Sequence, residues 1–171
     1  MPYQGFRPTL TPKVLPLVPR QKDALQDRSP LTALEVDILA RTIWGEARGE
    51  GKTGMEAVAC VILNRHKRAK EVGGYWWGNT VIEICQKPYQ FSCWNKSDPN
   101  RGKLLSVSED NPYFATALRI ARRALLGVLS DITKGATHYH TQSVKPYWMR
   151  YMDVMAHINN HIFYKEKSGA A

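Results

Sequence analysis

Two apolar stretches with helical spacing, separated by a glycine-rich run, are the features that most constrain the fold of this chain. Residues 33–47 and 54–68 each repeat apolar side chains every three or four positions, which is typical of helices with one buried face. Three glycines within residues 45–51 favour a turn between them. Thr32 and Glu35 have the spacing of a capping box at the start of the first stretch. The sequence therefore predicts two helices packed around a turn.

The rest of the chain adds one long helix and a few short elements. A capping box at Thr80 and Glu83 opens a short predicted helix, and Asn111 followed by Pro112 starts a long one that ends at Gly127. We expect an aromatic loop at 73–79, irregular structure at 87–101 with an extended piece at 89–94, and strands at 137–141 and 158–164. The expected fold class is α+β, mainly helical, with a small β component.

Proline divides the chain. Six of the ten prolines lie in the first thirty residues, where fixed φ angles and missing N–H donors exclude a helix or a central strand. We predict an extended basic arm at 1–30, one domain at 31–167 and a short tail at 168–171. Residues 1–30 lack the apolar segment of a secretory leader, so we expect synthesis in the cytoplasm without a Sec signal.

The composition is that of a globular protein with an unusual charge. The formal net charge is +9, and 43% of the residues are hydrophobic, which argues against a fibrous or disordered chain. No apolar run approaches the ~20 residues that a membrane helix needs. The charge favours polyanions as partners: nucleic acid, an anionic membrane surface or an anionic wall polymer.

Three cysteines are too few for a disulfide scaffold. Cys60 falls on the buried face of a predicted helix, whereas Cys85 and Cys93 bracket a short loop. An odd number of cysteines fits a reducing compartment, and a Cys85–Cys93 bridge in an oxidising one stays open as an alternative.

Glu46 is the first candidate for chemistry. It follows an apolar helix beside Trp44, and a carboxylic acid partly removed from water keeps its proton near neutral pH and can act as a general acid. The alternative is an ordinary solvated acid at a helix end. Tryptophans and tyrosines, among them Trp94 and Tyr139, lie in glycine- or proline-rich segments, where they can stack on sugar rings or bases or simply fill the core.

The histidines leave two interpretations open. His138 and His140 would lie on one face of a strand, and His157 and His161 on one face of a helix, so either pair can ligate zinc, pack, or bind substrate. No HExxH, GxSxG, P-loop or GxGxxG motif is present.

Four motifs in order resemble those of the SleB/CwlJ-type cell-wall hydrolases. They are IWGEARGE at 43–50 followed by AVACVILNR at 57–65, then QFSCW at 90–94, GATHYH at 135–140 and HIFY at 161–164. The resemblance covers about residues 35–165. It implies a lysozyme-like, lytic-transglycosylase-like domain that cleaves the glycan strand of bacterial peptidoglycan between muramic acid and its neighbour, without a cofactor or a metal.

The resemblance also implies roles for individual residues. Glu46 is the catalytic acid, which protonates the glycosidic oxygen and then accepts a proton from the sugar 6-hydroxyl or from water. For Glu50, capping or pairing with Arg48 or Arg65 is favoured over a second acid. We expect the substrate to be bound by side chains near Glu46: Trp44, Glu50, Gln90, Ser92, Trp94, His138, Tyr139 and His140.

The chain departs from the spore-germination members of that family, because a basic arm stands where a leader and a wall-binding domain are expected. We therefore expect a monomeric phage or prophage endolysin that acts on peptidoglycan in the periplasm or cell wall, binds no nucleic acid, and touches anionic membrane or wall weakly through its arm. Two rivals remain: a zinc-dependent peptidoglycan peptidase that uses the histidines, and a basic nucleic-acid-binding module.

Overall fold

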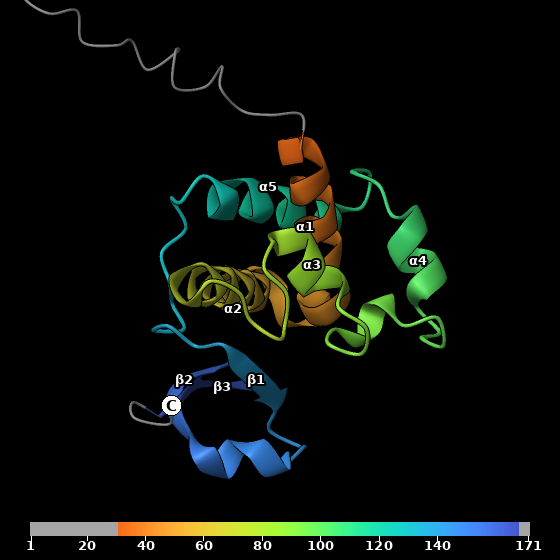
Figure 1. The fold of residues 1–171 in the computed structure, drawn as a ribbon. Helices are drawn as coiled ribbons and strands as arrows, with labels where there is room; N and C mark the ends of the chain where they lie inside the picture. Colours follow the sequence, from red (N-terminus) through yellow and green to blue (C-terminus); the bar gives the residue numbers. More distant parts are fainter. Residues whose placement is uncertain (1–30, 168–171) are drawn as a thin grey trace, which may run out of the picture.

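The computed structural model describes residues 31–167, so the predicted arm and tail lie outside the described residues. Helices form one layer and a small antiparallel sheet forms the other, below α2 in Figure 1. The helices and strands in chain order are α1 (Leu31–Ala47), α2 (Gly51–Val72), α3 (Val81–Gln86), α4 (Arg101–Ser106), α5 (Pro112–Leu125), β1 (His138–Thr141), β2 (Met152–Ile158) and β3 (His161–Glu166). The α+β, mainly helical class is confirmed.

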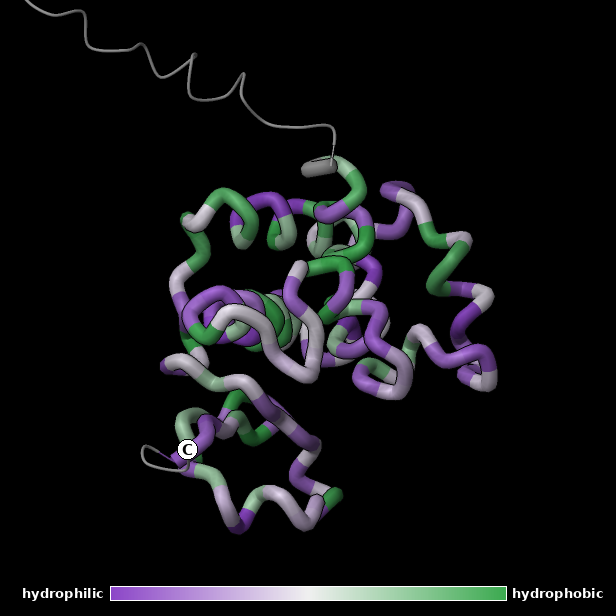
Figure 2. The backbone as a smooth tube through the Cα atoms, in the orientation of Figure 1, coloured by the Kyte–Doolittle hydropathy of each residue, from purple (hydrophilic) through white to green (hydrophobic). Residues whose placement is uncertain are grey.

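The helical layer is built around one core. α1 packs on α2 and α5, and their buried side chains include Leu39, Ile43, Met55, Ile62 and Ile120. Figure 2 shows hydrophobic and hydrophilic residues alternating along these helices, as expected when one face of each is buried. A smaller cluster joins α2 to the sheet through Ala57, Val61, Ala136 and Phe163.

Two predicted helix starts are confirmed in detail. The Thr80 hydroxyl accepts from the backbone N–H of Glu83 at 3.1 Å, and the Glu83 carboxylate accepts from that of Thr80 at 3.3 Å. The Asn111 side chain accepts from the backbone N–H groups of Tyr113 and Phe114, with Pro112 in the first turn. The predicted box at Thr32 concerns a side chain outside the described part of the chain.

Several predicted boundaries were wrong. α1 ends at Ala47 as predicted but begins at Leu31 rather than Ala33. A single 3-10 turn, Arg48–Glu50, joins it to α2, which runs from Gly51 rather than Gly54 and extends to Val72. Residues 89–94 are not extended, because a 3-10 turn covers Ser92–Trp94. α4 was not predicted; its six residues carry no long apolar stripe for a periodicity argument to detect.

The sheet has the strand order β1-β3-β2, and both pairs are antiparallel. β1 was predicted, and so was most of β3 within the strand predicted at 158–164. That strand was wrong at its start, where Ile158 ends β2 and a two-residue turn follows, and the rest of β2 was missed. His157 and His161 therefore lie on neighbouring strands of a hairpin and not on a helical face, which corrects that prediction. Within the described residues, no helix is long and apolar enough to cross a membrane.

Candidate active site

Glu46 lies in the last turn of α1, where three distant segments meet. Its Oε1 accepts a hydrogen bond from the backbone N–H of Cys93 at 3.3 Å, and its Oε2 accepts from the hydroxyl of Tyr139 at 3.1 Å. The side chain is half-buried. A carboxyl group held by two donors and still open to a cavity has the fixed orientation that proton transfer to a ligand requires.

The close approach to Cys93 depends on Gly45. A Cβ atom at this position would lie 2.7 Å from the Cys93 Cβ atom and 2.9 Å from its Sγ atom. Glycine therefore lets the Ser92–Trp94 turn pack directly on the end of α1. Burial and the neighbouring Glu46 carboxylate raise the pKa of the Cys93 thiol far above its ordinary range, so the thiol is no nucleophile at neutral pH.

Tyr139 is held firmly on the opposite side of Glu46. Its ring stacks on Phe163 with centroids 5.6 Å apart, and the edge of His161 meets it at 5.1 Å. Burial and the Glu46 carboxylate raise the pKa of the Tyr139 hydroxyl well above 10. Tyr139 thus keeps its proton and donates a hydrogen bond to Glu46.

A small polar pocket of about 140 Å³ opens beside Glu46. Ser92 and Trp44, both predicted to bind substrate, contribute to its wall. The sequence did not single out three of its polar members. The pocket residues are Trp44, Gly45, Glu46, Arg48, Ser92, Cys93, Asp98, Asn100 and Leu104.

Of the missed polar residues, Arg48 has a signal in the sequence, because it belongs to the motif that contains Glu46. Its guanidinium lies 4.4 Å from the centre of the Trp44 ring and donates to the Gly45 carbonyl at 3.1 Å. Asp98 and Asn100 fall in a segment rich in turn-forming residues, where nothing distinguishes a site residue from a turn residue.

Two tryptophans near the site have structural roles. Trp44 is buried, with only 5% of its surface exposed, and its ring meets Phe114 edge-on at 6.4 Å. The Trp94 indole donates to the hydroxyl of Thr42 at 3.0 Å, which fixes the 3-10 turn on α1. The burial of Trp44 leaves little of its ring open to a sugar, whereas Trp94 is only partly buried and its role in binding substrate stays a prediction.

Glu50 is not free to bind substrate in the way predicted. Asn160, in the turn between β2 and β3, donates to both of its carboxylate oxygens, from its side chain at 3.0 Å and its backbone at 3.1 Å. The expected partners Arg48 and Arg65 are not its partners. Glu50 ties the sheet to the start of α2, and the Asn160 side chain, foremost, lowers its pKa.

Gln90 is also corrected to a structural residue. Its amide nitrogen donates to the carbonyl oxygens of Ile84 at 2.7 Å and Trp77 at 3.1 Å, so it closes the aromatic loop onto α3. The amide is therefore turned into the protein and away from the Glu46 pocket.

His138 and His140 share one face of β1, as predicted, and both pack against Trp148, with ring centroids 5.2 and 5.6 Å away. Burial and the nearby Arg65 charge lower the pKa of His138 to about 4. Both nitrogens of His140 are engaged, with the Thr141 carbonyl and the Tyr164 hydroxyl. Within residues 31–167, no three His, Cys, Asp or Glu side chains gather as a metal site would require.

The three cysteines are buried with free thiols, so no Cys85–Cys93 bridge is present. Burial raises the pKa of both Cys60 and Cys85 to about 12. All three side chains therefore behave as small apolar residues.

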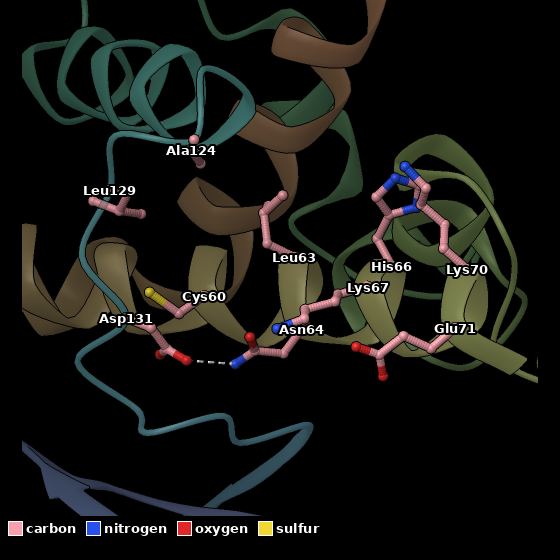
Figure 3. A pocket seen from close by; sticks show the side chains of 11 residues that line it. Cys60, Leu63, Asn64, His66, Lys67, Lys70, Glu71, Ala124, Leu129 and Asp131 are labelled. Carbon is pink, nitrogen blue, oxygen red and sulfur yellow. Dashed lines mark hydrogen bonds between the residues drawn. The ribbon is translucent and has the colours of Figure 1, made fainter.

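A larger cavity of about 520 Å³ lies elsewhere, along α2 and below the end of α5 (Figure 3). Its wall is mainly apolar, and Asp131 is occupied by hydrogen bonds from Asn64, Thr133 and Gly135. Glu46 and its partners are not part of it. The smaller polar pocket therefore remains the candidate active site.

Comparison with known proteins decides the family. A family model described as Cell Wall Hydrolase matches residues 49–164. The chain belongs to this family. Cys93 and Tyr139, the two partners of Glu46, lie inside the matched range, and Glu46 lies just before its first residue.

Curated relatives and solved structures agree. The chain is 28% identical over 132 residues to a spore cortex-lytic enzyme of Halalkalibacterium halodurans and 29% identical over 136 residues to one of Bacillus cereus, covering 75% and 77% of this chain. It spans only 34% and 44% of those relatives.

Two solved structures share its fold. One is the catalytic domain of the germination-specific lytic transglycosylase SleB from Bacillus anthracis, with 28% identity and a TM-score of 0.59 over 81% of this chain and 98% of that one. The other is the catalytic domain of the Bacillus cereus SleB protein, with 25% identity and a TM-score of 0.60 over 81% and 94%. The resemblance to SleB/CwlJ-type hydrolases is confirmed.

Proposed function

We propose that this cell wall hydrolase cleaves the glycan strands of bacterial peptidoglycan, with Glu46 as the proton donor and acceptor. The observation that carries the proposal is the Glu46 carboxyl group, fixed by Cys93 and Tyr139 at the edge of a polar pocket. Similarity to the catalytic domain of a lytic transglycosylase supports the reaction class.

In the proposed reaction, protonated Glu46 gives its proton to the glycosidic oxygen as the bond to the muramic acid carbon breaks. An oxocarbenium-like sugar results. The Glu46 carboxylate then accepts the proton of the sugar 6-hydroxyl as its oxygen bonds to that carbon, which gives a 1,6-anhydro product. One carboxyl group suffices, because the nucleophile is already part of the sugar and its effective concentration is large.

Hydrolysis is the second candidate, and Asp98 is the observation that favours it. This second carboxylate lines the same pocket, and its Oδ1 accepts from the backbone N–H of Asn100 at 2.7 Å. A second carboxylate beside the acid can activate water. Mass spectrometry of digested peptidoglycan separates the routes: anhydro-muramyl ends support the internal route, and reducing ends support hydrolysis.

The decisive variant is Glu46→Gln, which keeps the shape of the side chain but removes the transferable proton. We expect it to lower the rate of wall lysis by at least about 100-fold. Asp98→Asn is the matched control, since it makes the same change in the same pocket and leaves the internal route intact. A folded E46Q protein that still lyses walls would overturn the role of Glu46.

The proposed setting is bacteriolysis, with the enzyme made in the cytoplasm and acting on the wall after release, as an endolysin does. Purified vegetative sacculi and spore cortex fragments, digested side by side, test this setting. Preference for vegetative walls supports it, and digestion of cortex alone contradicts it. Peptides released without glycan cleavage would instead favour the rival peptidase.

A further inference from the structure

One buried charge near the site takes no part in the proposed reaction. Arg65, in α2, keeps only 7% of its surface exposed, yet no carboxylate among residues 31–167 forms a salt bridge with it. Its Nη1 atom is buried without a hydrogen-bond partner in the described chain. A buried cation without a counter-ion is costly, which calls for an explanation of its place in the fold.

The surroundings hold Arg65 in one orientation. Its Nε atom donates to the carbonyl of Thr137 at 2.7 Å, two residues before Tyr139. Its guanidinium carbon lies 5.5 Å from the ring centres of both Trp77 and Phe91. Burial lowers the pKa of Arg65 to about 10, so the group remains a cation at neutral pH.

Arg65 lies against the start of the strand that carries Tyr139, because it is buried and bonded to Thr137, the residue just before β1. Burial, the Glu46 carboxylate and the Cys93 thiol raise the pKa of the Tyr139 hydroxyl. The positive charge of Arg65 opposes that rise. A hydroxyl polarised in this way is a stronger donor, and its acceptor is Glu46 Oε2. His161, the other titratable group against the Tyr139 ring, has its pKa lowered mainly by burial, which disfavours a second positive charge there.

We propose that Arg65 is a positioning residue, whose buried positive charge strengthens the Tyr139 hydrogen bond to Glu46 and so stabilises the Glu46 carboxylate formed when the proton leaves. This role rests on the proposed function of Glu46. This role explains why the Arg65 guanidinium next to β1 has no counter-ion among the described residues. A carboxylate beside the guanidinium would cancel the electric field that reaches Tyr139.

The test is a double-mutant cycle on wall lysis with Arg65→Gln and Tyr139→Phe. Gln keeps an N–H donor for Thr137 but removes the charge. We expect each single variant to lower the rate about 10-fold, the cost of a weakened hydrogen bond to a charged group, and the double variant to lower it about 10-fold as well. Arg65→Lys keeps the charge, and we expect it to stay within about threefold of the native rate.

A purely structural Arg65 gives a different pattern. The losses of R65Q and Y139F would then multiply to about 100-fold, or follow the unfolded fraction measured by circular dichroism, and either result overturns the proposal. If R65Q fails to fold, R65K decides: a folded R65K protein that has lost more than about 10-fold activity rejects a role for the charge. An active E46Q variant would reject the proposed function instead, so the two failures are distinguishable.

Discussion

Glu46 depends on neighbours that are far away in the sequence. The Cys93 N–H group and the Tyr139 hydroxyl come from segments 47 and 93 residues further along the chain. Each fixes one carboxylate oxygen, and the intervening pocket leaves room for a ligand. The chemistry at this residue therefore depends on how tightly α1, the Ser92–Trp94 turn and β1 pack together.

The packing of the Ser92–Trp94 turn on the end of α1 can be tested by adding one methyl group at Gly45. We expect Gly45→Ala to destabilise the fold by about 1–3 kcal/mol, because the new Cβ overlaps the Cys93 side chain. We also expect the rate of lysis to fall about 10-fold, because Cys93 would move away from Glu46. Chemical denaturation and the lysis rate measure the two effects. Gly102→Ala in α4, where a Cβ meets nothing within 4 Å, is the control and should cost nothing. Native stability in G45A would contradict the overlap.

At the scale of elements, the long amphipathic helices were predictable and the site around them only partly so. Periodicity identified α1, α2 and α5, and local capping chemistry located the starts of α3 and α5. The motifs singled out Glu46 as the acid and Tyr139 as a substrate-binding residue; these roles stay predictions, and the structure adds the hydrogen bond between the two side chains. Arg48, Asp98 and Asn100 were missed, since only tertiary packing distinguishes them from turn residues, and Gln90 and Glu50 were misassigned because their partners are set by the folded chain.

Glu50 shows how one side chain connects the two layers. Its carboxylate receives both Asn160 donors, and the Asn159 side chain donates to its backbone carbonyl at 2.8 Å. These bonds hold the β2–β3 turn against the start of α2, and through β3 they hold β1, which carries Tyr139. A change at Glu50 should therefore act on stability and, indirectly, on activity.

The lowered pKa of Glu50 predicts a pH-dependent contribution to stability. In the folded state Glu50 releases its proton more readily than in the unfolded state, so its stabilising effect is present above pH 4.5 and is lost as the pH falls through the lower folded value. We expect Glu50→Gln to lower the free energy of unfolding by about 1 kcal/mol at pH 7, a modest amount because solvent screens the Glu50–Asn160 contact. The variant should also show a smaller fall in melting temperature below about pH 5.

The matched control for this experiment is Glu109→Gln, which changes an exposed glutamate whose nearest basic partner, Arg122, lies 3.9 Å away. Its melting temperature should follow the native protein at every pH. An E50Q protein with an unchanged acid profile would show that the Asn160 contacts contribute nothing to the folded state.

At the scale of the whole molecule, the net charge acts together with the site. Of the +9 total, residues 1–30 supply +3, from five basic and two acidic residues, which leaves 19 basic against 13 acidic residues in the rest of the chain. Such an excess raises the local concentration of an enzyme near an anionic wall polymer and speeds its encounter with that polymer. In the proposed function, the small pocket would carry the chemistry and the positive charge would attract the enzyme to the polymer.

Salt should therefore slow the enzyme on whole walls more than on small fragments. We expect lysis of sacculi to fall severalfold between about 50 mM and about 300 mM NaCl, where the screening length shortens from about 14 to about 6 Å. Cleavage of a short, soluble glycan fragment with few charges should change less than about twofold, because its binding involves only the pocket. Removal of residues 1–30 should reduce the salt effect on sacculi by about one third, in proportion to the charge removed. Equal salt dependence on both substrates would place the effect in the pocket, at Glu46, Arg48 or Asp98, and not in the charge of the molecule as a whole.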